Sequence, residues 1–230
     1  MVRLHALALT LLCAAALPAQ AQTCRLALQL ALDVSSSVDA DEYALQMRGN
    51  AAALRDPDVR AAFLSPDVGT VALSVFEWSG RWNQQEIAPW RMIESAGDLD
   101  AVIAQIEANI RSTDEAPTSL GHAMSHAARQ FRDGPVCAHR TVDVSADGPN
   151  NDGFPPSSSY GAYDWTGTTV NALVVGGDRA LELTAYYLTE VIRGDGAFVE
   201  VASDYADYTR ALRRKLLREL QPVFLLGALE

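Results

Sequence analysis

Three polar side chains in one short segment have the types and spacing to hold a metal ion. The segment reads Asp33-Val34-Ser35-Ser36-Ser37, so a carboxylate and two hydroxyls occupy alternate positions. On a turning loop, alternate side chains can direct their oxygens toward one centre, and oxygen ligands suit a hard cation such as Mg²⁺. Serine and aspartate are also favoured as helix caps, so the triplet alone leaves both a capping role and a metal-binding role open.

The residues before this segment predict a buried strand. Leu26 to Leu32 is a run of apolar or nearly apolar residues that stops at Asp33. Such a run, closed by small polar residues, is typical of a strand covered on both faces of a parallel sheet. In sheets of this kind, ligands bind in the loops beyond the carboxyl ends of the strands, which is where the three polar side chains fall.

Strand-like and helix-like segments alternate along the rest of the chain. Later strands are expected at 69–76, 83–90, 140–146, 169–175 and 197–201, and helices at 39–55, 59–64, 99–110 (capped by Asp98), 118–134, 181–192 and 205–220. This alternation favours a doubly wound α/β fold: a mainly parallel six-stranded sheet with one short antiparallel edge strand and helices on both faces. The stretch 154–168, rich in Pro, Ser and Gly, is expected to be a long loop.

Two further oxygen-bearing side chains lie at the ends of predicted elements. Thr118 opens the helix 118–134, and Asp147 follows the strand 140–146. In a parallel sheet, the loops that carry these residues can converge with the loop after Asp33 at the carboxyl edge. Five side chains would then meet there: Asp33, Ser35, Ser37, Thr118 and Asp147.

This arrangement resembles the metal-ion-dependent adhesion site (MIDAS) of von Willebrand factor type A (vWA) domains. That site has D-x-S-x-S after the first strand, a threonine on a later loop and an aspartate after the fourth strand. The matching segments here are DVSSS from Asp33, APTSLGHAM with Thr118, and VSADGPNN with Asp147. The resemblance covers nearly all of residues 25–220. The segments VFEWSG, VDVSADGPNN and 194–220 are also similar to a family of exported bacterial single-domain proteins with no assigned activity.

The resemblance implies a binding module and not an enzyme. A divalent cation, Mg²⁺ or else Mn²⁺ or Ca²⁺, would be held by Ser35, Ser37 and Thr118, with Asp33 and Asp147 acting partly through water. Mg²⁺ retains several waters when it binds to proteins, so an incomplete protein shell is chemically reasonable. An acidic group of a protein partner would complete the shell. vWA domains usually have a helix between the fourth and fifth strands, and the loop expected at 152–167 departs from that pattern.

The resemblance also implies that the first and fourth strands are parallel neighbours. Cys24 lies nine residues before Asp33 and Cys137 ten residues before Asp147, so the two cysteines would lie at nearly equal depth in the sheet. Neighbouring strands are close enough for a disulfide, and an oxidising compartment favours one. We expect a Cys24–Cys137 disulfide; the alternative is two unpaired thiols.

The first 21 residues have the features of a cleavable signal peptide. Arg3 precedes the apolar stretch Leu7 to Leu17, and Ala19-Gln20-Ala21 is a small-x-small cleavage pattern. We expect residues 1–21 to be removed, leaving a single domain, residues 22–230, as a periplasmic or secreted monomer. The formal net charge of −11 disfavours nucleic-acid binding, and no apolar segment is long enough for membrane insertion.

A hydrolase is the main alternative to a binding module. Asp33, a histidine and a serine could in principle form a nucleophilic triad, but the chain has no G-x-S-x-G segment. His122 and His126 are expected on the solvated side of their helix, without an acidic third ligand for zinc. A phosphoryl-transfer enzyme is disfavoured further because the phosphate-binding G-x-x-x-x-G-K-[ST] loop is missing from the sequence. A third alternative is a structural exported domain with a degenerate site.

Aromatic residues in the expected loop 154–168 leave two roles open. Tyr160, Tyr163 and Trp165 could act as anchors for a partner beside the metal, since aromatic side chains are enriched at binding hot spots. They could equally pack back onto the loop itself.

Overall fold

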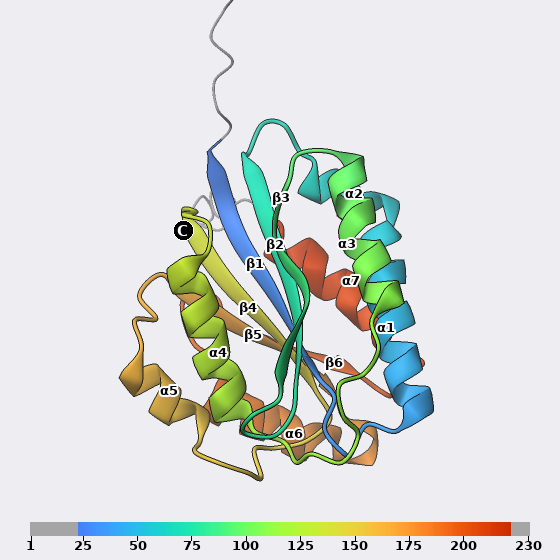
Figure 1. Cartoon of the computed structure of the whole chain (residues 1–230), viewed down its shortest axis with the longest axis vertical. Helices are drawn as coiled ribbons and strands as arrows, with labels where there is room; N and C mark the ends of the chain where they lie inside the picture. Colours follow the sequence, from blue (N-terminus) through green and yellow to red (C-terminus); the bar gives the residue numbers. More distant parts are fainter. Residues whose placement is uncertain (1–22, 222–230) are drawn as a thin grey trace, which may run out of the picture.

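Six strands form one sheet in the computed structural model, which describes residues 23–221 (Figure 1). The strands are β1 (Cys24–Asp33), β2 (Thr70–Trp78), β3 (Gln84–Ile93), β4 (His139–Ala146), β5 (Thr168–Val175) and β6 (Val199–Ala202). Their order across the sheet is β3-β2-β1-β4-β5-β6, and every neighbouring pair is parallel except β2 and β3. The predicted fold class is confirmed, including the antiparallel strand at one edge.

Helices cover both faces of this sheet (Figure 1). One layer contains α1 (Ala40–Arg55), α2 (Pro57–Phe63), α3 (Ala96–Ala108) and α7 (Tyr208–Glu219). The other layer contains α4 (Leu120–Asp133), α5 (Pro156–Ala162) and α6 (Ala180–Tyr186), which a 3₁₀ turn (Gly177–Arg179) precedes and a π-helical turn (Tyr187–Val191) follows. Among residues 23–221, no helix combines the length and the apolar character needed to cross a membrane. The predicted signal peptide lies outside the described residues.

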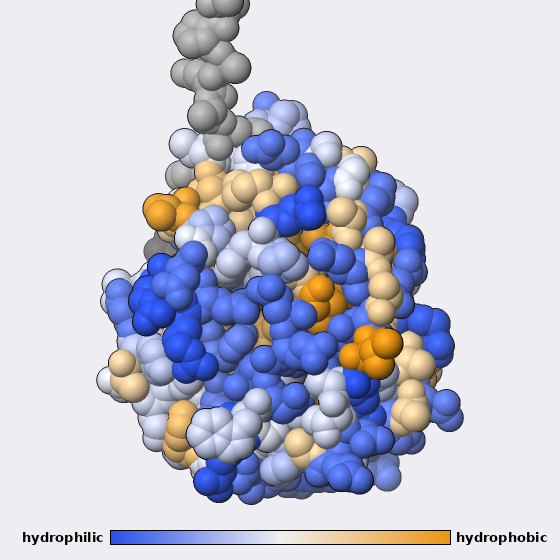
Figure 2. Space-filling model, viewed as in Figure 1, coloured by the Kyte–Doolittle hydropathy of each residue, from blue (hydrophilic) through white to orange (hydrophobic). Residues whose placement is uncertain are grey.

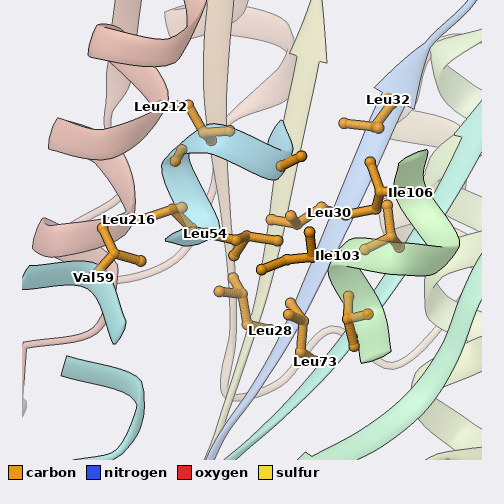
Figure 3. Close-up of a cluster of buried hydrophobic side chains, with 14 of the residues drawn as sticks. Leu28, Leu30, Leu32, Leu54, Val59, Leu73, Ile103, Ile106, Leu212 and Leu216 are labelled. Atoms are coloured by element: carbon orange, nitrogen blue, oxygen red, sulfur yellow. The ribbon is translucent and has the colours of Figure 1, made fainter. Parts of the chain in front are cut away.

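The side chains of β1 contribute to two hydrophobic clusters, one on each face of the sheet. Its leucines face the α1–α3–α7 layer, and Figure 3 shows Leu28 and Leu30 among side chains of that layer such as Leu54 and Ile103. Its small residues, including Ala27 and Ala31, face α4 instead. Alternation of side chains along a strand explains this division. Because both faces are covered, the strand is apolar from Leu26 to Leu32 except for the buried Gln29, close to what its sequence predicts.

The edge strand β3 is longer than predicted. It was expected to be a short strand, 83–90, ending near Pro89, but it continues through Pro89 to Ile93. Arg91 pairs with Leu73 and Ala88 pairs with Val75, so two β3 residues lie opposite the single residue Ser74. This bulge accommodates a proline, which has no N–H to donate to the neighbouring strand.

Two local predictions on helices are wrong. The stretch 154–168 is not one long loop, because α5 forms at Pro156–Ala162 with Pro156 in its first turn, where the missing N–H is tolerated. The structure therefore has a helix between the fourth and fifth strands, where the sequence predicts a loop. Helix α3 is capped by Ser95 and not by Asp98. The Asp98 side chain instead accepts a hydrogen bond from the Ser95 backbone, which completes a capping box.

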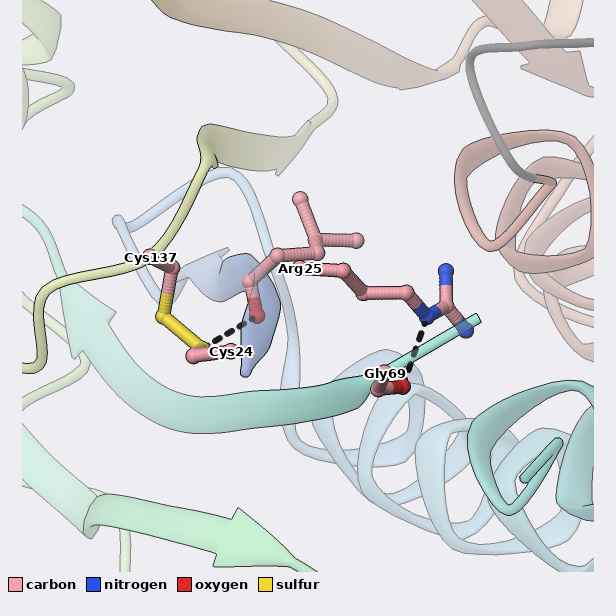
Figure 4. The surroundings of a disulfide bond; sticks show 5 residues. Cys24, Arg25, Gly69 and Cys137 are labelled. Atoms are coloured by element: carbon pink, nitrogen blue, oxygen red, sulfur yellow. Dashed lines mark hydrogen bonds between the residues drawn. A yellow bond between two sulfur atoms is a disulfide. The ribbon is translucent and has the colours of Figure 1, made fainter. Parts of the chain in front are cut away.

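A disulfide fastens the amino end of β1 (Figure 4). Cys24 and Cys137 are bonded, with their Cα atoms 4.6 Å apart, which confirms the predicted pairing and the predicted neighbours β1 and β4. Next to it, the Arg25 guanidinium donates to three carbonyls: Gly69 at 3.1 Å, Ala62 at 2.8 Å and Leu220 at 2.8 Å. The amino ends of three neighbouring strands are thus joined to α2 and to the end of α7.

Candidate metal centre

The five side chains singled out from the sequence meet at the carboxyl edge of the sheet. Asp33 ends β1, and Ser35 and Ser37 lie in the loop that follows. Thr118 lies two residues before α4, and Asp147 directly follows β4. Because β1 and β4 are parallel neighbours, their carboxyl ends lie at the same edge, and the Thr118 segment reaches that edge from the side of α4.

Hydrogen bonds connect four of these five side chains in a row. Thr118 Oγ1 donates to Ser35 Oγ at 3.1 Å, and the hydroxyls of Ser35 and Ser37 are 3.1 Å apart. Ser37 Oγ then donates to Asp147 Oδ1 at 2.6 Å. Ser35 and Thr118 are buried, whereas Ser37 is exposed, so the cluster is open to solvent on its Ser37 side.

Asp33 joins the cluster through one carboxylate oxygen only. Its Oδ1 accepts a hydrogen bond from the Ser35 backbone N–H at 2.8 Å, while the fully buried Oδ2 has no hydrogen-bond partner. Burial, and next the negative charge of Asp147, raise the pKa of Asp33 to about 8, against the opposing effects of Ser35 and Arg111. Burial also raises the pKa of Asp147. A buried, unpartnered carboxylate oxygen near a second carboxylate is an environment that a cation would stabilise.

The donor set itself fits a hard cation. Among residues 23–221, no three His, Cys, Asp or Glu side chains gather closely enough to hold a metal. The cluster has two carboxylates and three hydroxyls, so oxygen is the only donor element. Such ligands suit Mg²⁺, Mn²⁺ or Ca²⁺ better than metals that prefer sulfur or imidazole ligands.

Residues not singled out in the sequence hold the first loop in place. Arg111 Nη2 donates to the carbonyls of Val34, Ser35 and Val38 at 3.0, 3.0 and 2.7 Å. Gln46, fully buried on α1, donates to the Asp33 carbonyl at 2.9 Å. Helix α1 itself is capped by Asp39. The serines of the loop do not cap this helix, so their hydroxyls remain within the cluster.

The second half of the site is held by the segment that follows Asp147. Asn151 and Thr118 form two hydrogen bonds: Thr118 N–H donates to Asn151 Oδ1 at 2.9 Å, and Asn151 N–H donates to the Thr118 carbonyl at 3.0 Å. The hydroxyl of Tyr187 donates to the Gly148 carbonyl at 2.8 Å. The positions of Thr118 and Asp147 are therefore coupled through backbone contacts as well as through Ser35 and Ser37.

The prediction that both histidines of α4 lie on a solvated face is wrong for His126. His126 is half-buried against the Phe76 ring, with centroids 4.8 Å apart, and burial lowers its pKa to about 4. His122 lies 2.9 Å from Ser119 Oγ through its Nδ1. The Ser119 hydroxyl, however, donates to the Asp152 carbonyl at 3.0 Å. Because a hydroxyl has one proton, His122 acts as the donor in this pair and is not placed to activate the serine as a base.

Of the three aromatic residues singled out in 154–168, two pack inward, which is one of the two roles left open by the sequence. Trp165 is buried, and its ring lies edge-on to Tyr160 with centroids 5.1 Å apart, so these two side chains pack inward. Tyr163 instead accepts a hydrogen bond from Arg129 at 3.1 Å and lines a surface cavity of about 440 Å³.

The strand order, the two helical layers and the loop after β1 define a vWA fold. Three solved structures show the same fold. Proximal thread matrix protein 1 from the mussel byssus, in a structure with a zinc-occupied MIDAS motif, is 15% identical with a TM-score of 0.64 over 86% of this chain and 48% of its own. A von Willebrand factor type A protein from Catenulispora acidiphila is 13% identical with a TM-score of 0.61 over 86% and 43%. An aerotolerance-related membrane protein from Bacteroides fragilis is 16% identical with a TM-score of 0.53 over 84% and 99%.

These similarities establish the fold, and this chain spans about half the length of the mussel protein. The chain belongs to the family described as "Protein of unknown function (DUF1194)", whose sequence profile matches residues 23–224. No curated protein matches the chain.

Proposed function

We propose that this protein is a binding module that recognises a protein partner through a divalent cation. Ser35, Ser37 and Thr118 would hold the ion, with Asp33 and Asp147 acting partly through water. The observation that carries this proposal is the environment of Asp33. Its Oδ2 atom is buried without a hydrogen-bond partner, and burial and the charge of Asp147 raise the pKa of its carboxyl group. When bound, the cation supplies positive charge to this cluster and an open position for an acidic group of the partner.

The choice of metal follows from the donors. A structural neighbour holds zinc in its MIDAS motif, which supports the use of a divalent cation at this edge of the fold. The cluster in this chain contains only carboxylate and hydroxyl oxygens. We therefore infer Mg²⁺ as the preferred ion, with Mn²⁺ or Ca²⁺ as substitutes.

The face of the molecule in Figure 2 favours a specific contact over a broad apolar one. The face drawn in Figure 2 is mainly hydrophilic, with its hydrophobic residues in small separate groups. One large aromatic side chain is exposed near the cluster: Trp82 is 93% exposed in the turn between β2 and β3. It borders a cavity of about 400 Å³ that also includes Pro117, the residue before Thr118. A partner that reaches the cation can use Trp82 as an aromatic anchor.

Export is part of the same proposal. The disulfide is stable in an oxidising compartment, which supports a periplasmic or secreted protein. Residues 1–21 would act as a cleavable signal peptide, and residues 22–230 would form a single monomeric domain.

The metal site is tested with two neighbouring serines. Ser37→Ala removes a proposed ligand, and Ser36→Ala is its matched control, because both residues are exposed in the same loop. We expect Mg²⁺ to stabilise the wild-type protein and Ser36→Ala by about 2.7 kcal/mol at a hundred times its dissociation constant. The effect should be much weaker in Ser37→Ala and lost in Asp33→Ala, as measured by thermal unfolding with Mg²⁺ and with a chelator.

If Mg²⁺, Mn²⁺ and Ca²⁺ all leave the wild-type melting temperature unchanged, the site is degenerate and the protein is a structural domain. If the cation effect is equal in Ser36→Ala and Ser37→Ala, the ion binds elsewhere. A captured partner supports the function only when a chelator and Ser37→Ala both abolish its binding.

A further inference from the structure

A second group of charged side chains is buried between the sheet and α7, away from the carboxyl edge. Lys215 and Glu219 lie one turn apart on α7, and Asp143 lies in the middle of β4. The Lys215 Nζ atom is 2.7 Å from Asp143 Oδ1 and 2.5 Å from Glu219 Oε1. All three side chains are at most 1% exposed, so no solvent stabilises their charges.

The contact between Lys215 and Asp143 is a close, buried ion pair. Neither oxygen of Asp143 has a hydrogen-bond partner, although the ammonium nitrogen lies 2.7 Å from one of them. Lys215 does donate a hydrogen bond to Glu219. A buried carboxylate is stabilised by well-directed hydrogen bonds and by opposite charge, and the Lys215 ammonium is the group that stabilises Asp143 here.

The remaining contacts hold Glu219 beside the lysine and keep the cluster dry. Glu219 Oε1 also accepts a hydrogen bond from Asn171 Nδ2 at 2.7 Å. Asn171 is fixed in turn by the backbone N–H of Phe198, which donates to its Oδ1 at 3.1 Å. The Phe198 ring covers the ammonium, with Nζ 5.4 Å from the ring centroid. Burial raises the pKa of Asp143, so its carboxyl group takes up a proton more readily than a solvated one.

We propose that Lys215 and Asp143 are joined by an isopeptide bond, with Glu219 moving the protons. An amine, a carboxyl group and a neighbouring carboxylate are the three groups that this condensation needs, and the structure brings them together in a buried cluster. The bond would replace two opposite buried charges with one neutral amide, which removes the desolvation cost of both.

The reaction balances without any further reactant. Glu219 passes one proton from the Lys215 ammonium to the Asp143 carboxylate, which leaves a neutral amine beside a protonated carboxyl group. The amine attacks Cγ of Asp143, so that the C–N bond forms. Glu219 then takes a second proton from the nitrogen and gives it to the Asp143 hydroxyl, which leaves as water when its C–O bond breaks, and the nitrogen keeps one hydrogen. An ammonium and a carboxylate thus become an amide and one water, and Glu219 ends in its starting state.

The test is a peptide map of the protein expressed from its full sequence in a bacterium that exports it. Trypsin cleaves after Lys and Arg, so the bond would release residues 141–179 joined to residues 215–218, since a modified Lys215 resists cleavage. We expect this branched peptide, lighter than its two parts by one water, in the denatured and reduced protein. Fragment masses should place the link on Asp143.

Unlinked 141–179 as the main product, with normal cleavage after Lys215, would overturn the proposal and leave a buried ion cluster. Loss of ammonia in place of water would place the bond on Asn171 and would also overturn it. Glu219→Gln keeps the size of the side chain and should give unlinked peptides. Glu190→Gln, the same change on the exposed surface, should keep the branched peptide. If Glu219→Gln remains fully linked, Glu219 does not move the protons.

Discussion

The polar groups at the amino end of β1 are bonded to partners, whereas a carboxyl group at its other end is only partly hydrogen-bonded. At the amino end, Cys24 is bonded to Cys137 and the Arg25 guanidinium donates to three carbonyls. At the carboxyl end, Asp33 is fully buried with one oxygen unpartnered, near a second carboxylate. One strand therefore has a cross-linked, hydrogen-bonded end and an end with a buried carboxyl group that is only partly hydrogen-bonded. The difference indicates that the bonds at the amino end stabilise the fold. This stability offsets the cost of burying an unpartnered carboxyl oxygen at the carboxyl end.

The largest expected effect comes from removing the bond at the amino end. The double change Cys24→Ser and Cys137→Ser opens a loop with a sequence separation of 113 residues. The chain-entropy model gives a loss of up to about 4.7 kcal/mol for a loop of this size, or about 10 °C in melting temperature. Thermal unfolding of the oxidised wild type, the reduced wild type and the double variant measures it. Equal melting temperatures for all three would show that the amino end does not stabilise the fold.

A smaller effect of opposite sign is expected at the carboxyl end. In a chelator, and at a pH above the Asp33 pKa of about 8, Asp147→Asn should raise stability by about 1 kcal/mol, because it removes a negative charge near the ionised, buried Asp33. The matched control is Asp152→Asn in the same segment, where the carboxylate pairs with Arg81 at 2.8 Å and no gain is expected. Chemical denaturation with and without Mg²⁺ measures both. A loss of stability in Asp147→Asn would mean that its carboxylate is already balanced.

The last expected effect appears only as a pH dependence and concerns His126 on α4. Burial and then the charge of Arg129 lower its pKa to about 4, from an ordinary value of 6.5. Between these two values the unfolded chain binds a proton at this ring and the folded chain does not. Stability should therefore fall as the pH drops from about 6.5 toward 4.

The variant His126→Gln isolates this contribution, because glutamine cannot titrate. Its unfolding free energy should depend less on pH across this window than that of the wild type. The control is His139→Gln at the start of β4, where the side chain is exposed. The same pH dependence in both variants would assign the effect to other groups.

The sequence predicted the sheet and the position of the site because both depend on strong, regular patterns. The apolar run that stops at Asp33 marks a buried strand and its carboxyl end. Once β1 and β4 are neighbours, Asp147 must lie near Asp33 and Cys24 near Cys137. These relations follow from the register of parallel strands and need no knowledge of side-chain packing.

The errors arose where packing or short-range chemistry decides the structure. Helix α5 is seven residues long and shows no helical periodicity in its sequence. Helix α4 packs against both the sheet and α5, so His126 is covered on a side that a simple amphipathic pattern leaves to solvent. Arg111 and Gln46 contact the first loop from other segments, and their sequence positions alone give no sign of it. The same holds for Lys215 and Asp143, which only the folded chain brings together.

The contact between Arg25 and Leu220 determines how the molecule can be attached to a surface. It joins the first strand to the end of α7, so residues far apart in the sequence lie together at the amino end of the sheet. The candidate metal centre lies at the other end of the same strand. A tether fused before residue 23 or after residue 221 would therefore leave that centre pointing away from the point of attachment. Protein immobilised through a tether before residue 23 or after residue 221 should bind a Mg²⁺-dependent partner equally well.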